Sequence, residues 1–181
     1  MKALLTAILL LLLPYPGLLA QDNEAAKAAA ASSPEHIYRF LARYEGTWTV
    51  EVSEWSQAEA DPEKYTLTAV LNMVLGDRFL QWSQTGVGPR GAFEEWATLG
   101  YDEPGDRFSL VWLSSAGTAN ETAQGSWTEA GRSASLSPVC DAAGGHRYII
   151  RFMDKDNFQV EQYQQGAGEA FKTREYHYSR Q

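Results

Sequence analysis

From Thr47 to the C-terminus, apolar and polar residues alternate with a period of two, the pattern of β-strands with one buried and one solvent-facing side. Clusters of glycine, proline, aspartate and asparagine interrupt this pattern about every dozen residues, and such clusters form turns. We therefore predict ten strands joined by short turns. They run approximately over residues 47–55, 65–75, 78–86, 93–101, 108–114, 122–128, 133–139, 147–154, 158–164 and 171–180.

Short turns make each strand the antiparallel partner of its neighbour in the chain. No helical pattern separates the strands, so a parallel sheet covered by helices is excluded. An open row of strands would expose two unpaired edges, and pairing of the first strand with the last removes both. The pattern predicts an all-β fold, a closed antiparallel up-and-down β-barrel of about ten strands, with a β-sandwich as the alternative.

A short helix is expected just before the first strand. Ser33 and Pro34 suit the N-cap and the first turn of a helix, and Gly46 suits its end. Between them, apolar residues recur at helical spacing on one face. These residues are Ile37, Phe40, Leu41 and Tyr44.

The first 20 residues have the features of a signal peptide. Lys2 supplies a positive charge, residues 3–13 form an apolar run, and Ala20 is a small residue at a suitable cleavage site. The run is shorter than the ~20 apolar residues of a membrane-spanning helix, so we expect cleavage and no stable membrane insertion. The predicted organisation is a signal peptide at 1–20, a flexible spacer at 21–33 and the barrel domain at 34–181, in a protein that is exported, either periplasmic or secreted.

Charge and composition exclude several classes of function. The formal net charge is −8 and the sequence has no basic block, so nucleic acid is not an expected partner. Cys140 is the single cysteine, which leaves no intramolecular disulfide. His36, His146 and His177 are isolated from other metal-ligating residues, and motifs for nucleophilic catalysis or phosphate binding are missing. We expect no catalytic residues, no metal and no cofactor, and hence a protein that is not an enzyme; the oligomeric state stays open.

Several short motifs together resemble one bacterial family. They are Gly46-Thr47-Trp48, Leu75-Gly76-Asp77-Arg78-Phe79-Leu80, Leu99-Gly100-Tyr101-Asp102 and Tyr178-Ser179-Arg180. The family is known only as a domain of unknown function and is related to lipocalins and fatty-acid-binding proteins, and the match covers about residues 34–180. The resemblance implies a calycin (lipocalin-like) barrel with an internal cavity. It also implies that Trp48 plugs one end of the barrel and that Arg180 lies across it.

The last strand carries the best candidates for ligand binding. Arg174, Tyr176, Tyr178 and Arg180 share one face of this strand because side chains alternate. If that face points inward, Arg174 and Tyr176 resemble the Arg-x-Tyr pair with which fatty-acid-binding barrels hold a carboxylate. If it points outward, the same residues cover a polar surface.

Aromatic residues are the second group of candidates. Trp96, Tyr101 and Trp112 could line a pocket with the last strand, and ordinary core packing is the alternative for all of them. The hypothesis is an exported protein that binds a small apolar or amphipathic ligand inside the barrel. The alternatives are a structural or protein-interaction module with a filled barrel, a haem-binding barrel that uses His177, and an enzyme.

Overall fold

The computed structural model describes residues 33–117, 120–129, 131–139, 145–164 and 170–181. The predicted signal peptide, Cys140 and the spacer up to residue 32 lie outside these ranges. The described part contains helix α2 (Pro34–Ala42) and ten strands. The strands are β1 (Gly46–Glu54), β2 (Glu63–Val74), β3 (Phe79–Gly88), β4 (Gly91–Asp102), β5 (Arg107–Ser114), β6 (Glu121–Glu129), β7 (Ser133–Pro138), β8 (His146–Phe152), β9 (Asn157–Gln164) and β10 (Phe171–Arg180).

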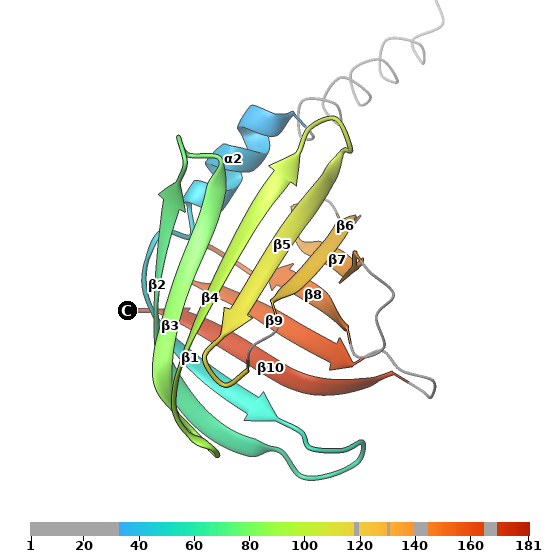
Figure 1. Ribbon diagram of the computed structural model, residues 1–181. Coiled ribbons are helices and arrows are strands. Elements are labelled where there is room, and N and C mark those ends of the chain that lie inside the picture. Colours follow the sequence, from blue (N-terminus) through green and yellow to red (C-terminus); the bar gives the residue numbers. More distant parts are fainter. Residues whose placement is uncertain (1–32, 118–119, 130, 140–144, 165–169) are drawn as a thin grey trace, which may run out of the picture.

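The ten strands close into one antiparallel barrel, in which every strand pairs with its neighbours in the chain and β1 pairs with β10. In Figure 1, β2–β5 run close to upright, whereas β8–β10 run across the view at a steep angle to them. The predicted closed up-and-down barrel is therefore confirmed, and the sandwich alternative is wrong. Closure leaves neither the first nor the last strand with an unpaired edge.

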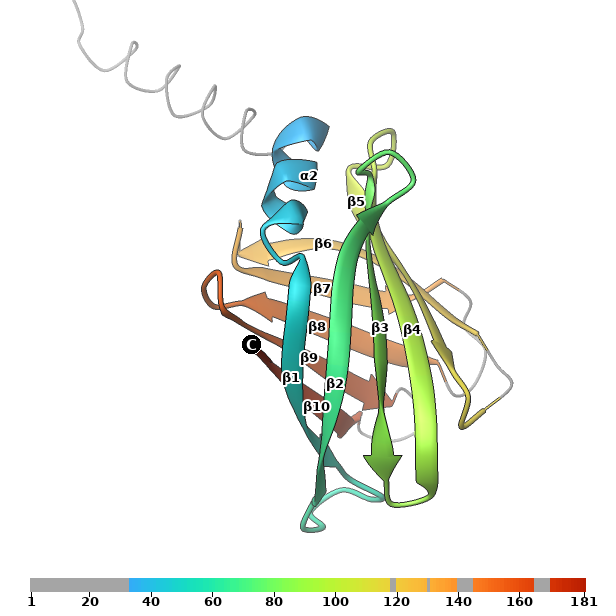
Figure 2. The same ribbon diagram turned by 90° about the vertical axis from the view of Figure 1, so that its left-hand side faces the viewer.

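Helix α2 covers one end of the barrel (Figure 2). Ser33 caps the helix, since its Oγ accepts a hydrogen bond from the backbone N–H of His36 at 3.4 Å, and Pro34 occupies the first turn. Ile37 and Leu41 are buried on the face that turns toward the strands. Within the described residues, no helix has the length and apolar character that crossing a membrane requires.

Aromatic rings fill the half of the barrel next to α2. The rings of Phe158 and Tyr178 stack with their centroids 4.0 Å apart, and Phe158 also packs edge-on against Trp48 at 5.1 Å. Tyr44, just after the helix, stacks on Trp48 at 6.2 Å and packs edge-on against Phe158 at 5.6 Å. This half of the interior is therefore a packed core.

Trp48 and Arg180 lie together at the helix-covered end. Trp48 is fully buried, and its Nε1 donates a hydrogen bond to the backbone carbonyl of Tyr44 at 3.0 Å. The guanidinium carbon of Arg180 lies 4.4 Å from the centroid of the Trp48 ring. Gly46 has a φ of +131°, and a Cβ at this position would lie 2.8 Å from Nη1 of Arg180. The Gly-x-Trp spacing thus leaves room for the arginine.

The Arg180 guanidinium also joins three segments of the chain. It donates to the backbone carbonyls of Arg43 and Glu45 after the helix, each at 2.6 Å. It donates in addition to the carbonyl of Lys155 at 2.7 Å and to the carboxylate of Asp156 at 3.1 Å, both in the β8–β9 turn. One planar side chain thereby holds the helix and the turn to the last strand.

We expect Arg180→Lys to lower the free energy of unfolding by about 2 kcal/mol, because an ammonium group cannot reach these acceptors together. Urea unfolding followed by tryptophan fluorescence measures the change. Arg39→Lys is the matched control, since Arg39 forms an exposed ion pair with Glu35 on the helix and should change stability by less than about 0.5 kcal/mol. Equal stabilities of the two variants would contradict the role given to Arg180.

Candidate ligand-binding site

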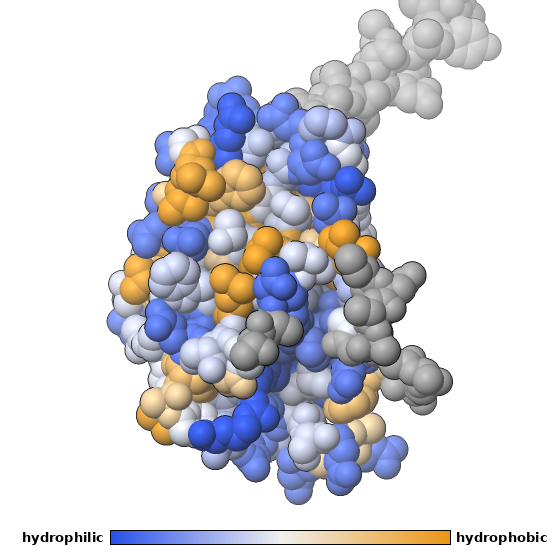
Figure 3. Space-filling model, viewed as in Figure 1, coloured by the Kyte–Doolittle hydropathy of each residue, from blue (hydrophilic) through white to orange (hydrophobic). Residues whose placement is uncertain are grey.

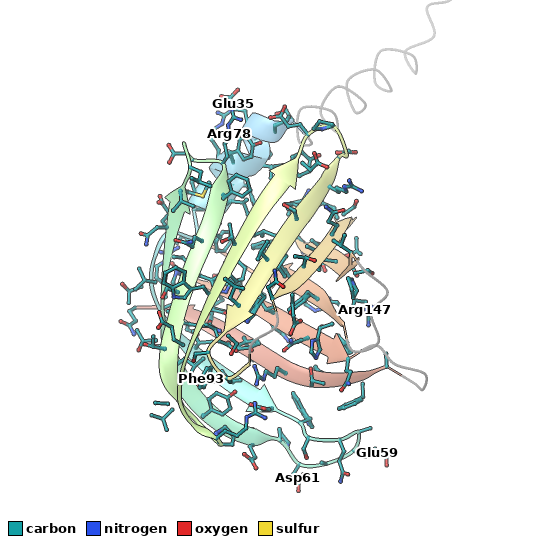
Figure 4. All side chains as sticks on the ribbon, in the orientation of Figure 1. Glu35, Glu59, Asp61, Arg78, Phe93 and Arg147 are labelled. Carbon is teal, nitrogen blue, oxygen red and sulfur yellow. The ribbon has the colours of Figure 1, made fainter. Side chains whose placement is uncertain are left out.

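A cavity of about 720 Å³ opens at the end of the barrel opposite α2. Its wall includes the end of β1 at Glu54, the β1–β2 connection at Asp61, the β3–β4 hairpin at Arg90 and the β5–β6 connection at Ala116. Figure 4 shows Asp61 at the lower end of the molecule, far from Glu35 of the helix. The open end is thus built from the connections that lie farthest from the aromatic core.

A smaller cavity of about 230 Å³ adjoins the first one. The two share wall residues, among them Glu54, Arg90 and Arg174. The smaller cavity is the more aromatic, because Tyr65 and Phe93 line it and pack edge-on at 5.9 Å. Charged groups therefore line both cavities, and the rings of Tyr65 and Phe93 lie at the smaller one.

Arg174 lies on the wall that the two cavities share, and its side chain is 15% exposed. Its Nη1 donates to Oε1 of Glu95 at 3.0 Å, and its Nη2 donates to Oε1 of Glu54 at 3.2 Å. Nη1 also lies 3.2 Å from the hydroxyl of Tyr176. Two carboxylates therefore already bind this guanidinium.

A chain of buried polar groups continues from Arg174 into the barrel. Glu95 is 1% exposed, and its Oε2 accepts hydrogen bonds from Gln84 Nε2 at 2.7 Å and from the Tyr176 hydroxyl at 3.3 Å. The Tyr178 hydroxyl then donates to Oε1 of Gln84 at 2.8 Å. Burial raises the pKa of both tyrosines well above the ordinary value, so both hydroxyls keep their protons.

Glu54, like Arg174, lines both cavities. It accepts hydrogen bonds from the Tyr65 hydroxyl at 2.7 Å and from Arg90 Nη2 at 3.1 Å, in addition to the bond from Arg174. Burial alone would raise the pKa of Glu54, but the Tyr65 hydrogen bond and the charges of Arg174 and Arg90 outweigh it and hold the pKa below its usual value. Glu54 is therefore ionised at neutral pH.

Glu121 and His146 form a second polar group on the cavity wall. Nδ1 of His146 lies 2.8 Å from Oε2 of Glu121, and the Tyr148 hydroxyl donates to the same oxygen. Gln162 in turn donates to the Tyr148 hydroxyl at 3.3 Å. Burial opposes ionisation of Glu121, but the bonds from His146 and Tyr148 prevail and lower its pKa.

The structure brings together most of the residues selected from the sequence. Arg174, Tyr176 and Tyr178 all point into the barrel. Trp112 is also inside, with its ring stacked on Tyr148 at 5.7 Å and tilted against Tyr176 at 5.3 Å. Trp112 and Tyr176 lie between Arg174 at the cavity wall and Tyr178 in the aromatic core.

Two other predicted site residues lie elsewhere. The prediction for Trp96 is wrong, because alternation along β4 places it on the outer surface, where it is 49% exposed and donates to Glu94 at 2.6 Å. Figure 3 shows small apolar patches among polar residues on this side of the barrel. Tyr101 packs edge-on against Phe108 and donates to Asp106, near α2 and away from the cavity.

The network also corrects the expected role of Arg174. A pairing of Arg174 and Tyr176 with a ligand carboxylate would require a free guanidinium, but Glu54 and Glu95 occupy it. A third carboxylate at this place would meet the charge of the other two. The geometry thus disfavours an acidic ligand head at Arg174.

The alternative of a haem held by His177 does not fit the structure. His177 is on the outer side of β10, 44% exposed, and its Nε2 lies 2.6 Å from Glu175. His146 lines the cavity but is bound to Glu121. Across the described ranges, no group of three or more metal-ligating side chains comes together.

Sequence reasoning missed Glu54, Glu95, Glu121 and His146 as members of the site. Glu95 did carry a signal, because it occupies an apolar register with Phe93, Ala97 and Leu99 on alternate positions of one strand. A carboxylate in such a register is buried and requires a cationic partner. The neighbouring Glu94 faces solvent, as alternation requires.

A closed antiparallel barrel, sealed by a helix at one end and hollow at the other, defines a lipocalin-like (calycin) protein. The family model described as "Protein of unknown function (DUF1579)" matches residues 33–180. The chain belongs to this family. Comparison with curated protein sequences finds no match.

Two solved structures share the fold. Rv2717c from M. tuberculosis superposes with a TM-score of 0.58 at 18% sequence identity, over 79% of this chain and 96% of that one. The S-type phycobiliprotein lyase CPES from Guillardia theta superposes with a TM-score of 0.55 at 16% identity, over 80% of this chain and 92% of that one. At these identities the likeness shows the fold alone.

The expectation that the protein is not an enzyme needs correction. It rested on the lack of local catalytic motifs in the sequence, but a barrel of the same fold is a lyase by its name. A lipocalin-like barrel therefore does not exclude catalysis, and distant strands can supply polar groups that no local motif contains.

We expect Glu95→Ala to lower the free energy of unfolding by about 3–5 kcal/mol, because it leaves the half-buried Arg174 charge without one of its partners. Glu94→Ala is the matched control on the same strand, since this side chain is exposed, and it should cost less than about 1 kcal/mol. Denaturant unfolding measures both values. A small effect of Glu95→Ala would mean that the buried network contributes little to stability.

The same network predicts loss of stability in acid. A carboxyl group whose pKa is lower in the folded protein stabilises the fold above its unfolded pKa, and this contribution disappears as pH falls through the folded pKa. The pKa values of Glu54 and Glu121 both lie below the ordinary 4.5, so their contribution should decline below about pH 4.5. Urea unfolding at a series of pH values should give a shallower acid decline for Glu54→Gln than for the unaltered protein. Equal slopes would contradict the expectation.

Proposed function

We propose that the protein is an exported barrel that binds a small amphipathic molecule in the cavity at its open end. The observation that carries the proposal is the 720 Å³ cavity whose wall contains the ordered network of Arg174 and Glu54. Cavities of about 300–1,000 Å³ with a few fixed polar groups are the usual form of small-molecule sites. The polar side chains here are held by their own partners, so binding would require little reorganisation.

An amphipathic ligand suits the two cavities better than a purely apolar one. Carboxylate and guanidinium groups line both cavities; the larger adds the imidazole of His146, and the smaller adds the rings of Tyr65 and Phe93. A polar head beside the charged groups and a short apolar part against these rings would satisfy both. A long chain directed toward α2 would meet Trp112 and Tyr176, which pack against each other and are buried.

The second candidate function is a structural or protein-interaction module. The filled half of the barrel favours it, because stacked rings such as Phe158 and Tyr178 leave that part of the interior to packing. Such a module would use its outer surface, and the cavity would hold only water. Ligand binding distinguishes the two candidates.

Export is part of the proposal and rests on the N-terminal sequence. The charged start at Lys2, the apolar run at 3–13 and the small residue Ala20 support a cleaved leader. The protein would then act in the periplasm or outside the cell.

Binding can be tested on protein recovered after export from a bacterial host. Native mass spectrometry would detect a co-purifying small molecule, and the intact mass would reveal removal of residues 1–20. Isothermal titration calorimetry with single-chain amphiphiles that carry cationic, neutral or anionic heads would then measure affinity. We expect at least one head group to bind with a stoichiometry of about one, as for a single site.

Two tryptophan substitutions supply the matched comparison. Ala116→Trp adds a large side chain on the wall shared by the two cavities and should weaken binding about tenfold or more by steric occlusion. Ala58→Trp places the same side chain on an exposed part of the β1–β2 connection and should leave the affinity unchanged. Absence of binding by every amphiphile and of any co-purifying molecule would favour the interaction module.

A further inference from the structure

The charges around the cavity are unbalanced. The wall carries the carboxyl groups of Glu54, Asp61, Glu63 and Glu121. The guanidinium groups on the same wall belong to Arg90 and Arg174. Among the described residues of the wall, acidic groups therefore outnumber these basic ones.

The positive charge of Arg174 is not available to an incoming anion. Its two terminal nitrogens bind Glu54 and Glu95, at 3.2 and 3.0 Å. Two negative charges thus surround one positive charge, and Glu95 is too deeply buried for water to screen it. Both carboxylates therefore occupy this guanidinium.

Arg90 balances one of these two carboxylates, so the acidic excess on the wall comes from Glu121, Asp61 and Glu63. It is 68% exposed and pairs with Glu54 at 3.1 Å. Glu121 adds a further carboxylate on the wall, bound to His146 and Tyr148. Its lowered pKa and that of Glu54 keep both groups ionised at neutral pH.

We infer that the cavity selects amphiphiles with a cationic head group and discriminates against those with an anionic one. The inference rests on the proposed function and names the class of ligand for the same site. A cation such as a quaternary ammonium group would lie among Glu54, Glu63 and Glu121, with its apolar part toward Tyr65 and Phe93. A carboxylate of the same size would meet these carboxylates, while the Arg174 guanidinium is already bound to Glu54 and Glu95.

Three ligands with the same chain test the inference on the full exported protein. They are octyltrimethylammonium, octanol and octanoate, titrated calorimetrically at neutral pH and low salt. The cation should bind about tenfold or more tightly than octanoate, with octanol between them. The difference should shrink as salt is added, because the rim carboxylates Asp61 and Glu63 are exposed and their field is screened.

Matched substitutions locate the effect in the cavity. Glu121 begins β6 on the cavity wall and Glu129 ends the same strand near α2. Glu121→Gln and Glu129→Gln remove the same charge, but only the first should reduce the preference for the cation, by about threefold or more. Glu63→Gln is a second variant of the cavity wall. Because the Glu63 side chain is exposed, the substitution should not disturb the fold, and it should also reduce the preference for the cation.

Each outcome has a separate meaning. A cation preference that falls in Glu121→Gln and Glu63→Gln, but not in Glu129→Gln, supports the inference. Equal or tighter binding of octanoate overturns it and leaves the proposed function standing. Absence of binding by all three ligands overturns the proposed function as well.

Discussion

The pairing of β1 with β10 determines both ends of this molecule. One antiparallel register sets Trp48 opposite Arg180 and, six residues along, Glu54 opposite Arg174. The first pair lies at the end that α2 covers, and the second lies at the cavity. A slip of one residue would turn both arginines to the outside, because side chains alternate between the two faces. Closure of the barrel, the sealed end and the charged cavity wall therefore depend on the same set of backbone hydrogen bonds.

The sequence was sufficient to predict the architecture because alternation and turn residues are local signals. Ten strands, the helix from Pro34 and the closed topology all follow from patterns within a few residues. Alternation placed Arg174, Tyr176 and Tyr178 on one face of the last strand, but it could not tell whether that face points into the barrel or out of it. The partners of Arg174 could not be predicted either, since Glu95 and Glu54 lie 79 and 120 residues away in the chain. The assignment of Trp96 to the pocket failed for a simpler reason. It considered only that the side chain is aromatic, whereas Trp96 follows Glu95 directly in the strand and therefore points to the opposite face.

Family membership and fold similarity do not determine which molecule the cavity binds. Membership of the DUF1579 family and the likeness to Rv2717c and to a phycobiliprotein lyase concern the backbone. Chemistry depends on side chains that the barrel holds inside, and at such low identity these have to be considered one by one. Here they divide the interior into two parts. Apolar rings near α2 stabilise the fold, whereas the charged groups opposite α2 are largely buried, and their mutual hydrogen bonds offset the cost of that burial.

The stacked rings behind Trp112 and Tyr176 give the barrel the form of a cup with a solid base. A molecule in the cup would have to enter and leave by the same rim, past the β1–β2 connection and the β3–β4 hairpin. Arg90, at the tip of that hairpin, is 68% exposed beside this path and pairs with Glu54. Substitutions in the hairpin would then change the rates at which a ligand enters and leaves the cavity. They would leave the thermal stability of the protein the same, because the aromatic core lies at the other end of the barrel.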